Sequence, residues 1–195
     1  MSDRTIGHTT MAWAPVTSIN DVRPTAFAAL TQAERTRLES MSDARADEFL
    51  LGRYLLRALA VDLGAAQHPN QVIITAVCST CGGQHGRPEI EGFRASITHA
   101  TGMAVVALAP VDAVAALGID TESTDALENA DALVRWVSGE AVLKADGRGL
   151  RGDVPLELDV TAQGGSAVVK DSGKRYELTS IQIPGRVTFL AVEIA

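Results

Sequence analysis

The chain has few aromatic residues and only two cysteines. Of its 195 residues, 4% are aromatic although 46% are hydrophobic, so a folded core must consist mainly of Ala, Val, Leu and Ile. The cysteines, Cys78 and Cys81, form a single C-x-x-C pair. That arrangement is not the disulfide framework typical of small secreted proteins.

The chain also lacks an excess of positive charge and a long apolar run. Its net charge is −7, which argues against a nucleic-acid partner. The most apolar stretch, "MAVVALAPVDAVAALGI", is interrupted by Pro110 and Asp112 and is too short for a membrane span. The first residues, "MSDRTIGHTTMAWAPVTS", do not read as a secretory signal. We therefore expect a cytoplasmic protein that binds neither nucleic acid nor membrane.

Hydrophobic periodicity predicts helices followed by strands, twice over. Thr31 and Glu34 have capping-box spacing, a second helix should start near Ser42, and Gly64 is a candidate helix end. A third helix should end at Gly147. The predicted strands lie at 72–78, 95–100, 103–109, 113–120, 156–162, 166–171, 175–183 and 186–194.

Two pairs of segments indicate an internal repeat. "FLLGRYLLRALA" at 49–60 aligns with "WVSGEAVLKADG" at 136–147, which matches Gly52 with Gly139 and Arg53 with Glu140. "GMAVVALAPV" at 102–111 resembles "GRVTFLAVEI" at 185–194. We therefore expect an α+β fold of two similar lobes, 1–103 and 104–195, related by a pseudo-twofold axis with a cleft between them.

Two carboxylates stand side by side in "GIDTE". On a strand, Asp120 and Glu122 point to the same face and Thr121 points to the other. Such a pair resists burial unless a cation lies between its members, and oxygen ligands suit Mg²⁺. The alternative is a solvated strand end.

The third predicted helix places further charged residues on one face. Trp136, Glu140 and Lys144 have i, i+4, i+8 spacing. Glu140 and Lys144 could form a simple surface pair, but a tryptophan on the same face suggests that this face is partly covered. A covered glutamate beside a lysine suits a site where a metal meets an anionic oxygen.

Other candidate residues lie earlier in the chain. In "SITHATG", His99 should face away from the neighbouring Thr98, and the hydroxyls of Ser96, Thr98 and Thr101 could bind phosphate. Arg53, Arg57 and Arg87 add positive charge. The loop "CSTCGGQHG" offers Cys78, Cys81 and His85, which resembles half of a zinc site or, alternatively, a structured loop with reduced thiols.

Taken in order, five strings resemble the surfactin-type 4′-phosphopantetheinyl transferases, in the branch common in bacteria that make polyketides and nonribosomal peptides. They are "FLLGRYLLRALA", "HGRPEI", "SITHATGMAVVAL", "LGIDTE" and "RWVSGEAVLKADGRGL". The resemblance covers about residues 31–151. It implies the two-lobe, pseudo-twofold fold of that family. It also implies Mg²⁺-dependent transfer of phosphopantetheine from coenzyme A to a serine of an acyl or peptidyl carrier protein, with release of 3′,5′-ADP.

The resemblance also implies roles for individual residues. Asp120, Glu122 and Glu140 would hold the metal, and Glu140 would alternatively take the serine proton, directly or through water. Lys144 would pair with the pyrophosphate. The coenzyme-binding residues would be Arg53, Arg87, Thr98 and His99, and Arg35 would lie near the 3′-phosphate.

One departure from the family pattern concerns Gly139, which stands where the family usually has lysine in Trp-x-x-Lys-Glu-Ala. A glycine inside a helix costs about 1 kcal/mol relative to alanine. The alternatives to a transferase are a non-catalytic, coenzyme A-binding or regulatory relative and a zinc-loop interaction module. We expect a monomer, because two lobes in one chain would already form the cleft.

Overall fold

The computed structural model describes residues 1–78, 80–126, 128–148 and 154–194. The chain falls into two compact units, Met1–Pro110 and Val111–Ala195. The described residues form an α+β structure with two five-stranded antiparallel sheets and four α-helices. The division lies after Pro110, whereas the sequence suggested a boundary at 103–104, where strand β5 begins. Among the described residues, no helix has both the length and the apolar character needed to cross a bilayer.

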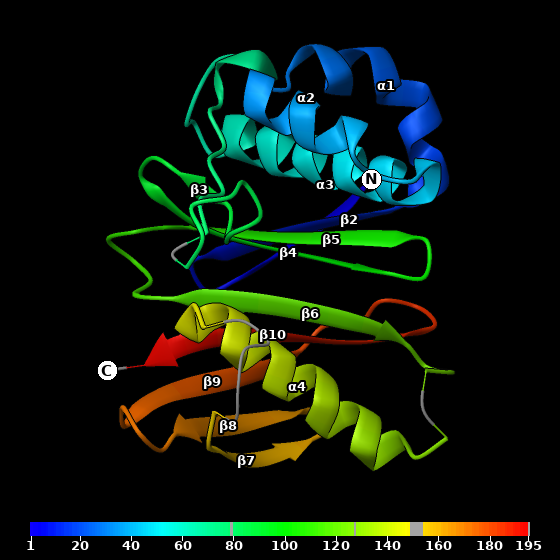
Figure 1. Cartoon of the computed structure of the whole chain (residues 1–195). Coiled ribbons are helices and arrows are strands. Elements are labelled where there is room, and N and C mark those ends of the chain that lie inside the picture. Colours follow the sequence, from blue (N-terminus) through cyan, green and yellow to red (C-terminus); the bar gives the residue numbers. More distant parts are fainter. Residues whose placement is uncertain (79, 127, 149–153, 195) are drawn as a thin grey trace. The chain divides into compact units, whose positions relative to one another are not determined.

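In the first unit, three helices lie on one side of a sheet with strand order β1-β2-β5-β4-β3 (Figure 1). The helices are α1 (Ile19–Ala28), α2 (Gln32–Glu39) and α3 (Asp43–Asp62). The strands are β1 (Ser2–Ile6), β2 (Thr9–Pro15), β3 (Glu89–Ile90), β4 (Phe93–Ala100) and β5 (Met103–Pro110).

The helix boundaries in this unit follow local sequence signals. Thr31 and Glu34 form the predicted capping box, in which the Thr31 hydroxyl accepts from the Glu34 N–H and the Glu34 carboxylate accepts from the Thr31 N–H. Ser42 is the residue before α3, and Gly64 adopts a left-handed conformation after it. These three predictions are confirmed.

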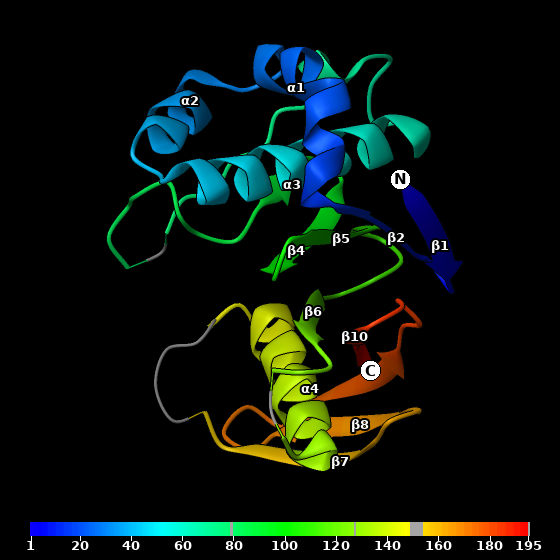
Figure 2. The ribbon, with the colours of Figure 1, turned by 90° about the vertical axis from the view of Figure 1, so that its right-hand side faces the viewer.

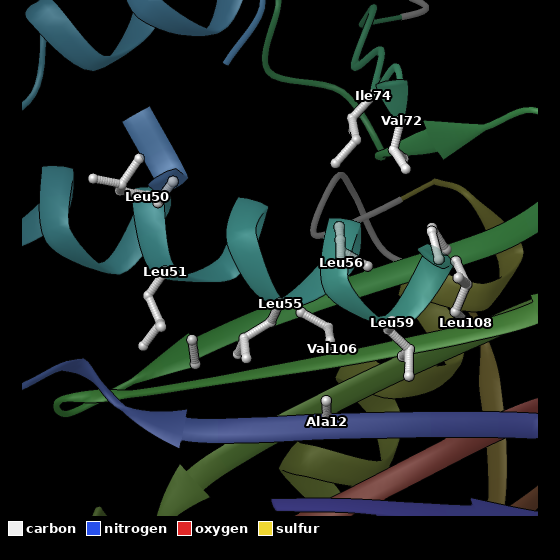
Figure 3. Close-up of a cluster of buried hydrophobic side chains, with 14 of the residues drawn as sticks. Ala12, Leu50, Leu51, Leu55, Leu56, Leu59, Val72, Ile74, Val106 and Leu108 are labelled. Carbon is white, nitrogen blue, oxygen red and sulfur yellow. The ribbon is translucent and has the colours of Figure 1, made fainter. Parts of the chain in front are cut away.

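Leucines of α3 form the core of the first unit. Figure 3 shows Leu51, Leu55 and Leu59 pointing from α3 toward the strands. All three are at most 3% exposed. Burying a leucine side chain contributes about 1.5–3 kcal/mol, so this helical stripe is a large apolar contribution to the unit. The low aromatic content is consistent with a core of this kind.

Two segments of this unit differ from the prediction: one was predicted wrongly and the other had no predicted element. Residues 72–78 were predicted as a strand, but among the described residues they form a single bridge, between Thr75 and Glu89. Val72 and Ile74 are buried while Ile73 is exposed, so the alternation of burial is strand-like, although the described part of the chain holds no full partner strand for this segment. The weakly patterned first 30 residues, which form β1, β2 and α1, had no predicted elements.

In the second unit, one helix packs against a sheet with strand order β6-β10-β9-β8-β7. Figure 2 shows this helix, α4 (Ala130–Asp146), which contacts β6, β10 and β7. It ends at Gly147, as predicted, with that residue in the left-handed conformation. The strands are β6 (Leu117–Ser123), β7 (Leu156–Thr161), β8 (Gly164–Val169), β9 (Lys174–Ser180) and β10 (Arg186–Ile194).

Each unit pairs the strand before its longest helix with its last strand. These pairs are β2 with β5 and β6 with β10, both antiparallel. Gly102 and Gly185 precede the last strands, both with positive φ. On the paired strand of the first unit, Ala14 and Ala12 lie opposite the residues two and four positions after Gly102. On the paired strand of the second unit, Glu122 and Asp120 lie opposite the residues two and four positions after Gly185. The two units share a framework, and only the second carries the acidic pair.

Two glycines of the second unit give a matched test of backbone packing. At Gly118, an added Cβ would lie 2.1 Å from the Ala141 carbonyl oxygen and 2.4 Å from the Ala145 nitrogen. We expect Gly118→Ala to lower the free energy of unfolding by about 2–3 kcal/mol, since backbone cannot move aside cheaply. Urea unfolding at constant pH measures this difference.

Gly139→Ala is the control for that substitution. Its Cβ would meet only Leu158 and Leu156, at 3.7 and 3.8 Å, which is ordinary contact. Replacing a helical glycine by alanine should therefore raise the free energy of unfolding by about 0.5–1 kcal/mol. Equal effects of the two substitutions would contradict this description of the contact between β6 and α4.

Candidate functional site

The acidic candidates Asp120, Glu122 and Glu140 all belong to the second unit, on β6 and α4. Gly118 faces α4 at backbone contact distance, and Asp120 and Glu122 follow it at intervals of two residues on the same strand face. Thr121 points the other way, where its hydroxyl lies 2.6 Å from that of its cross-strand neighbour Thr188. The predicted alternation along "GIDTE" is therefore confirmed.

An ion pair joins the strand to the helix. The Lys144 ammonium donates a hydrogen bond to the Asp120 carboxylate, with Nζ 2.6 Å from Oδ1. The Asp120 side chain is 6% exposed and that of Lys144 is 26% exposed, so the lysine reaches a mostly buried carboxylate from the solvent side. Such a lysine can exchange this partner for another anion without being buried itself.

Two further carboxylates, those of Glu140 and Glu122, interact electrostatically with the Asp120–Lys144 pair. Burial raises the pKa of Glu140, the negative charges of Asp120 and Glu122 raise it further, and Lys144 opposes them. Burial likewise raises the pKa of Glu122, with Asp120 adding to the rise and with Lys144 and Arg186 lowering it. The three carboxylates therefore lie within electrostatic reach of one another and are not fully compensated.

These three carboxylates offer oxygen ligands that could hold a divalent cation such as Mg²⁺. Oxygen ligands and excess negative charge suit the ion, which usually takes one or two protein carboxylates and completes its shell with water and substrate phosphate. In the part of the chain that the structure describes, these three carboxylates do not form a group whose oxygens all lie within 4.8 Å. The arrangement thus fits direct binding by one or two of them, with the third acting through water.

Trp136 is covered far less than Glu140 on the same helix face. Its side chain is 56% exposed, whereas Glu140, one turn later on the same helix, is 8% exposed. Burial of Glu140 therefore does not extend along the face to Trp136. It follows from the position of Glu140 close to β6, whose Gly118 contacts α4 at Ala141.

The phosphate-binding candidates Thr98 and His99 lie on β4 of the first unit. An added Cβ at Gly52 would lie 2.3 Å from Ile97 Cδ1 and 2.6 Å from His99 Nε2, so Ile97 and His99 face α3. Ser96 and Thr98 point to the opposite face and are buried. The predicted separation of His99 from Thr98 across the strand is confirmed, while their binding of a coenzyme stays a prediction.

Arg53 and Arg57, on α3, share a partner that the sequence analysis did not assign to them. Glu34 accepts two hydrogen bonds from Arg57, at 3.3 and 2.6 Å, and its carboxylate also lies 3.2 Å from Arg53 Nε. Burial lowers the pKa of Arg53 to about 10, against the opposing effect of Glu34, so the group is charged at neutral pH. The capping-box spacing had already identified Glu34 in the sequence. Its pairing with Arg57, 23 residues later, could be found only from the folded structure.

The remaining arginine candidates contact backbone carbonyls. Arg87 Nε donates to the Ala95 carbonyl at 3.4 Å. Arg35 donates to the carbonyls of Leu30 and Ala28, at 3.2 and 3.3 Å, which fastens α2 to the end of α1. Arg186 on β10, which acts on Glu122, was not found in the sequence because its position depends on strand pairing.

The structure also brings together the loop candidates. Sulfur and nitrogen ligand atoms of Cys78, Cys81 and His85 all lie within 4.8 Å of one another. Neither cysteine is in a disulfide.

A scan against protein-family models finds no match for this chain, and a comparison with curated protein sequences finds none either. The residues and their geometry are therefore the basis of any functional assignment.

The shared carboxylate Glu34 can be tested through stability. Glu34→Gln keeps the shape but leaves the two buried guanidinium groups without a negative partner, so we expect a loss of about 3 kcal/mol in the free energy of unfolding. Glu39→Gln, at an exposed position of the same helix, should change it by less than about 0.5 kcal/mol. Similar small effects of both would show that Glu34 is not the main partner of the arginines.

The acidic cluster should make stability depend on pH. Because the pKa of Glu140 is raised on folding, the folded protein retains a proton that the unfolded chain has released, and stability falls as the pH rises above the ordinary glutamate value of 4.5. Glu140→Gln removes the charge and should therefore raise the unfolding temperature at pH 7 but not at pH 4. The measurement is made without divalent ions.

Glu177→Gln, at an exposed position on β9, is the control and should leave the unfolding temperature unchanged at both pH values. If Glu140→Gln instead lowered the unfolding temperature at pH 7, the Glu140 carboxylate would have to be stabilised by cationic neighbours.

Proposed function

We propose that this protein transfers 4′-phosphopantetheine from coenzyme A to a serine hydroxyl of an apo acyl or peptidyl carrier protein, with Mg²⁺ as cofactor. The observation that carries the proposal is the grouping of Asp120, Glu122, Glu140 and Lys144 where β6 meets α4. These are the residues to which the sequence resemblance assigns the metal and the pyrophosphate.

The proposal includes the family's pseudo-twofold fold of two lobes. Two features support it: the shared strand pairing of the units, β2 with β5 and β6 with β10, and the matching positions of Gly102 and Gly185. The acidic pair is present in only one unit, so a fold of this kind would contain one metal site rather than two.

In the proposed reaction, the serine oxygen forms a bond to the β-phosphorus of coenzyme A. The bond from that phosphorus to the bridging oxygen breaks, and 3′,5′-ADP leaves with the electron pair. Bound Mg²⁺ would neutralise charge on the pyrophosphate. Asp120 and Glu122 would hold it, and Lys144 would exchange its contact with Asp120 for a pyrophosphate oxygen.

Glu140 would accept the serine proton, directly or through a water molecule. A serine hydroxyl is a weak nucleophile, so a base within reach helps. The raised pKa of Glu140 makes its carboxylate a stronger proton acceptor than an ordinary glutamate. The nucleophile would come from the carrier protein, so the chain needs no catalytic serine of its own.

Arg53, Arg87, Thr98 and His99 are the proposed coenzyme-binding residues. All four belong to the first unit, on α3, on β4 and in the loop before β3. They would supply positive charge and hydrogen-bond donors for the nucleotide phosphates. Because Arg53 is already paired with Glu34, its contribution would be made by a guanidinium that is fixed in place before the coenzyme binds.

The test is the intact mass of a purified apo carrier protein after incubation with this protein, coenzyme A and Mg²⁺. We expect the carrier to gain the mass of one phosphopantetheine. Glu140→Gln and Asp120→Asn should lower the rate by about 100-fold or more, because each removes a charge that acts on the reacting phosphate or its metal. Glu177→Gln, far from these residues in sequence and exposed, should retain the wild-type rate.

The alternative is a non-catalytic coenzyme A-binding or regulatory relative. Tight coenzyme A binding without any mass gain, over several carrier proteins, would favour that alternative. In that case Gly139→Lys, which restores the residue usual in the family, should be assayed next.

A further inference from the structure

The loop before β3 holds a cluster of potential metal ligands that the proposed transferase reaction does not use. Cys78, Cys81 and His85 occur within eight residues, and Cys81 Sγ lies 3.0 Å from His85 Nε2. In the part of the chain that the structure describes, this is the one group of three Cys, His or acidic side chains whose ligand atoms all lie within 4.8 Å of one another.

The backbone of this loop is folded tightly enough to fix those side chains. The Cys78 N–H donates to the Gly83 carbonyl at 2.7 Å, and the Gly82 N–H donates to the Cys78 carbonyl at 2.8 Å. At Gly86, an added Cβ would lie 2.4 Å from the Val77 carbonyl oxygen, so only glycine fits there. Arg37 on α2 also donates to the Gln84 carbonyl, at 2.9 Å.

The type of ligand selects the metal. Two thiolates and an imidazole are soft or borderline ligands, which suit Zn²⁺ and not the Mg²⁺ of the acidic site. In a tetrahedral zinc site, ligand atoms at about 2.0–2.3 Å from the metal lie about 3.3–3.8 Å from one another. The three ligand atoms lie within 4.8 Å of one another, and Cys81 Sγ and His85 Nε2, now 3.0 Å apart, would separate slightly when the ion enters.

A hydrogen bond between a thiol and a histidine would account for Cys81 and His85 alone. It would not require Cys78, which is 6% exposed, to place its sulfur beside the same two atoms. The ligand atoms of Cys78, Cys81 and His85 all come together in one glycine-rich turn. This distinguishes a metal site from a loop that simply holds two thiols.

We propose that Cys78, Cys81 and His85 bind one Zn²⁺ ion, with water in the fourth position. Cys81 and His85 are exposed, so that position is open to solvent. Binding requires both thiols as thiolates and the imidazole as the neutral form, so protons are released when the ion enters. The proposal does not depend on the transferase activity.

The ion would add a cross-link to a segment that has little regular secondary structure. Between α3 and β4, the described residues contain one turn of 3-10 helix, the single bridge from Thr75 to Glu89 and the two-residue strand β3. A cross-link from Cys78 to His85 would close this loop next to Arg87. A protein that binds zinc there should resist proteolysis within residues 72–92 better than the zinc-free form.

The experiment measures zinc in the full-length protein, reduced and loaded with zinc and then passed through gel filtration. We expect about one zinc per chain, and less than about a tenth in Cys81→Ser and in His85→Gln. His8→Gln, which removes an exposed histidine from the β1–β2 turn, should retain the wild-type zinc content. Far-UV circular dichroism checks that each variant is folded.

Cobalt substitution gives a second readout of the same ligands. Co²⁺ in the wild-type protein should show a thiolate-to-cobalt charge-transfer band, which Cys78→Ser should weaken. The proposal is overturned if the reduced wild-type chain holds less than about a tenth of an equivalent of zinc, or if zinc persists in both Cys81→Ser and His85→Gln. A Cys78–Cys81 disulfide that persists under the reducing conditions would also overturn it.

Discussion

The second unit depends on one close contact between backbones. At Gly118, β6 approaches α4 so nearly that no side chain fits between the strand and the Ala141–Ala145 turn. Because alternate residues of a strand share a face, the same contact directs Asp120 toward the helix, where Lys144 pairs with it. A wider spacing between strand and helix would separate Asp120 from Lys144, and each charged group would then be solvated by water instead of by its partner.

The close approach of β6 to α4 brings the carboxylates of Asp120, Glu122 and Glu140 near one another, where they repel. Burial and mutual repulsion raise the pKa values of Glu122 and Glu140, and from this we expect amides at these positions to stabilise the folded state at neutral pH. The matching strand of the first unit has Ala12 and Ala14 at the equivalent positions. The strand pairing that the two units share is therefore built without acidic residues in the first unit.

Buried charged side chains are paired differently in the two units. In the first, Glu34 joins the capping box to both Arg53 and Arg57, so each buried charge has an opposite partner. In the second, Lys144 is only partly buried and partners one of three nearby carboxylates. The first arrangement links α2 to α3, whereas the second places Glu122 and Glu140 beside Asp120 with Lys144 between strand and helix. This difference is the physical reason why we propose the metal site in the second unit.

The sequence by itself determined the elements that follow local rules: the capping box at Thr31, the helix end at Gly147, the alternation of Asp120 and Thr121, and four C-terminal strands. Local rules could not determine what depends on partners distant in the chain. Among the described residues, the strand expected at 72–78 lacks a full partner, Trp136 is exposed although Glu140 is buried, and Glu34 serves two arginines. Pairing and burial come from tertiary packing, so only the three-dimensional structure could decide them.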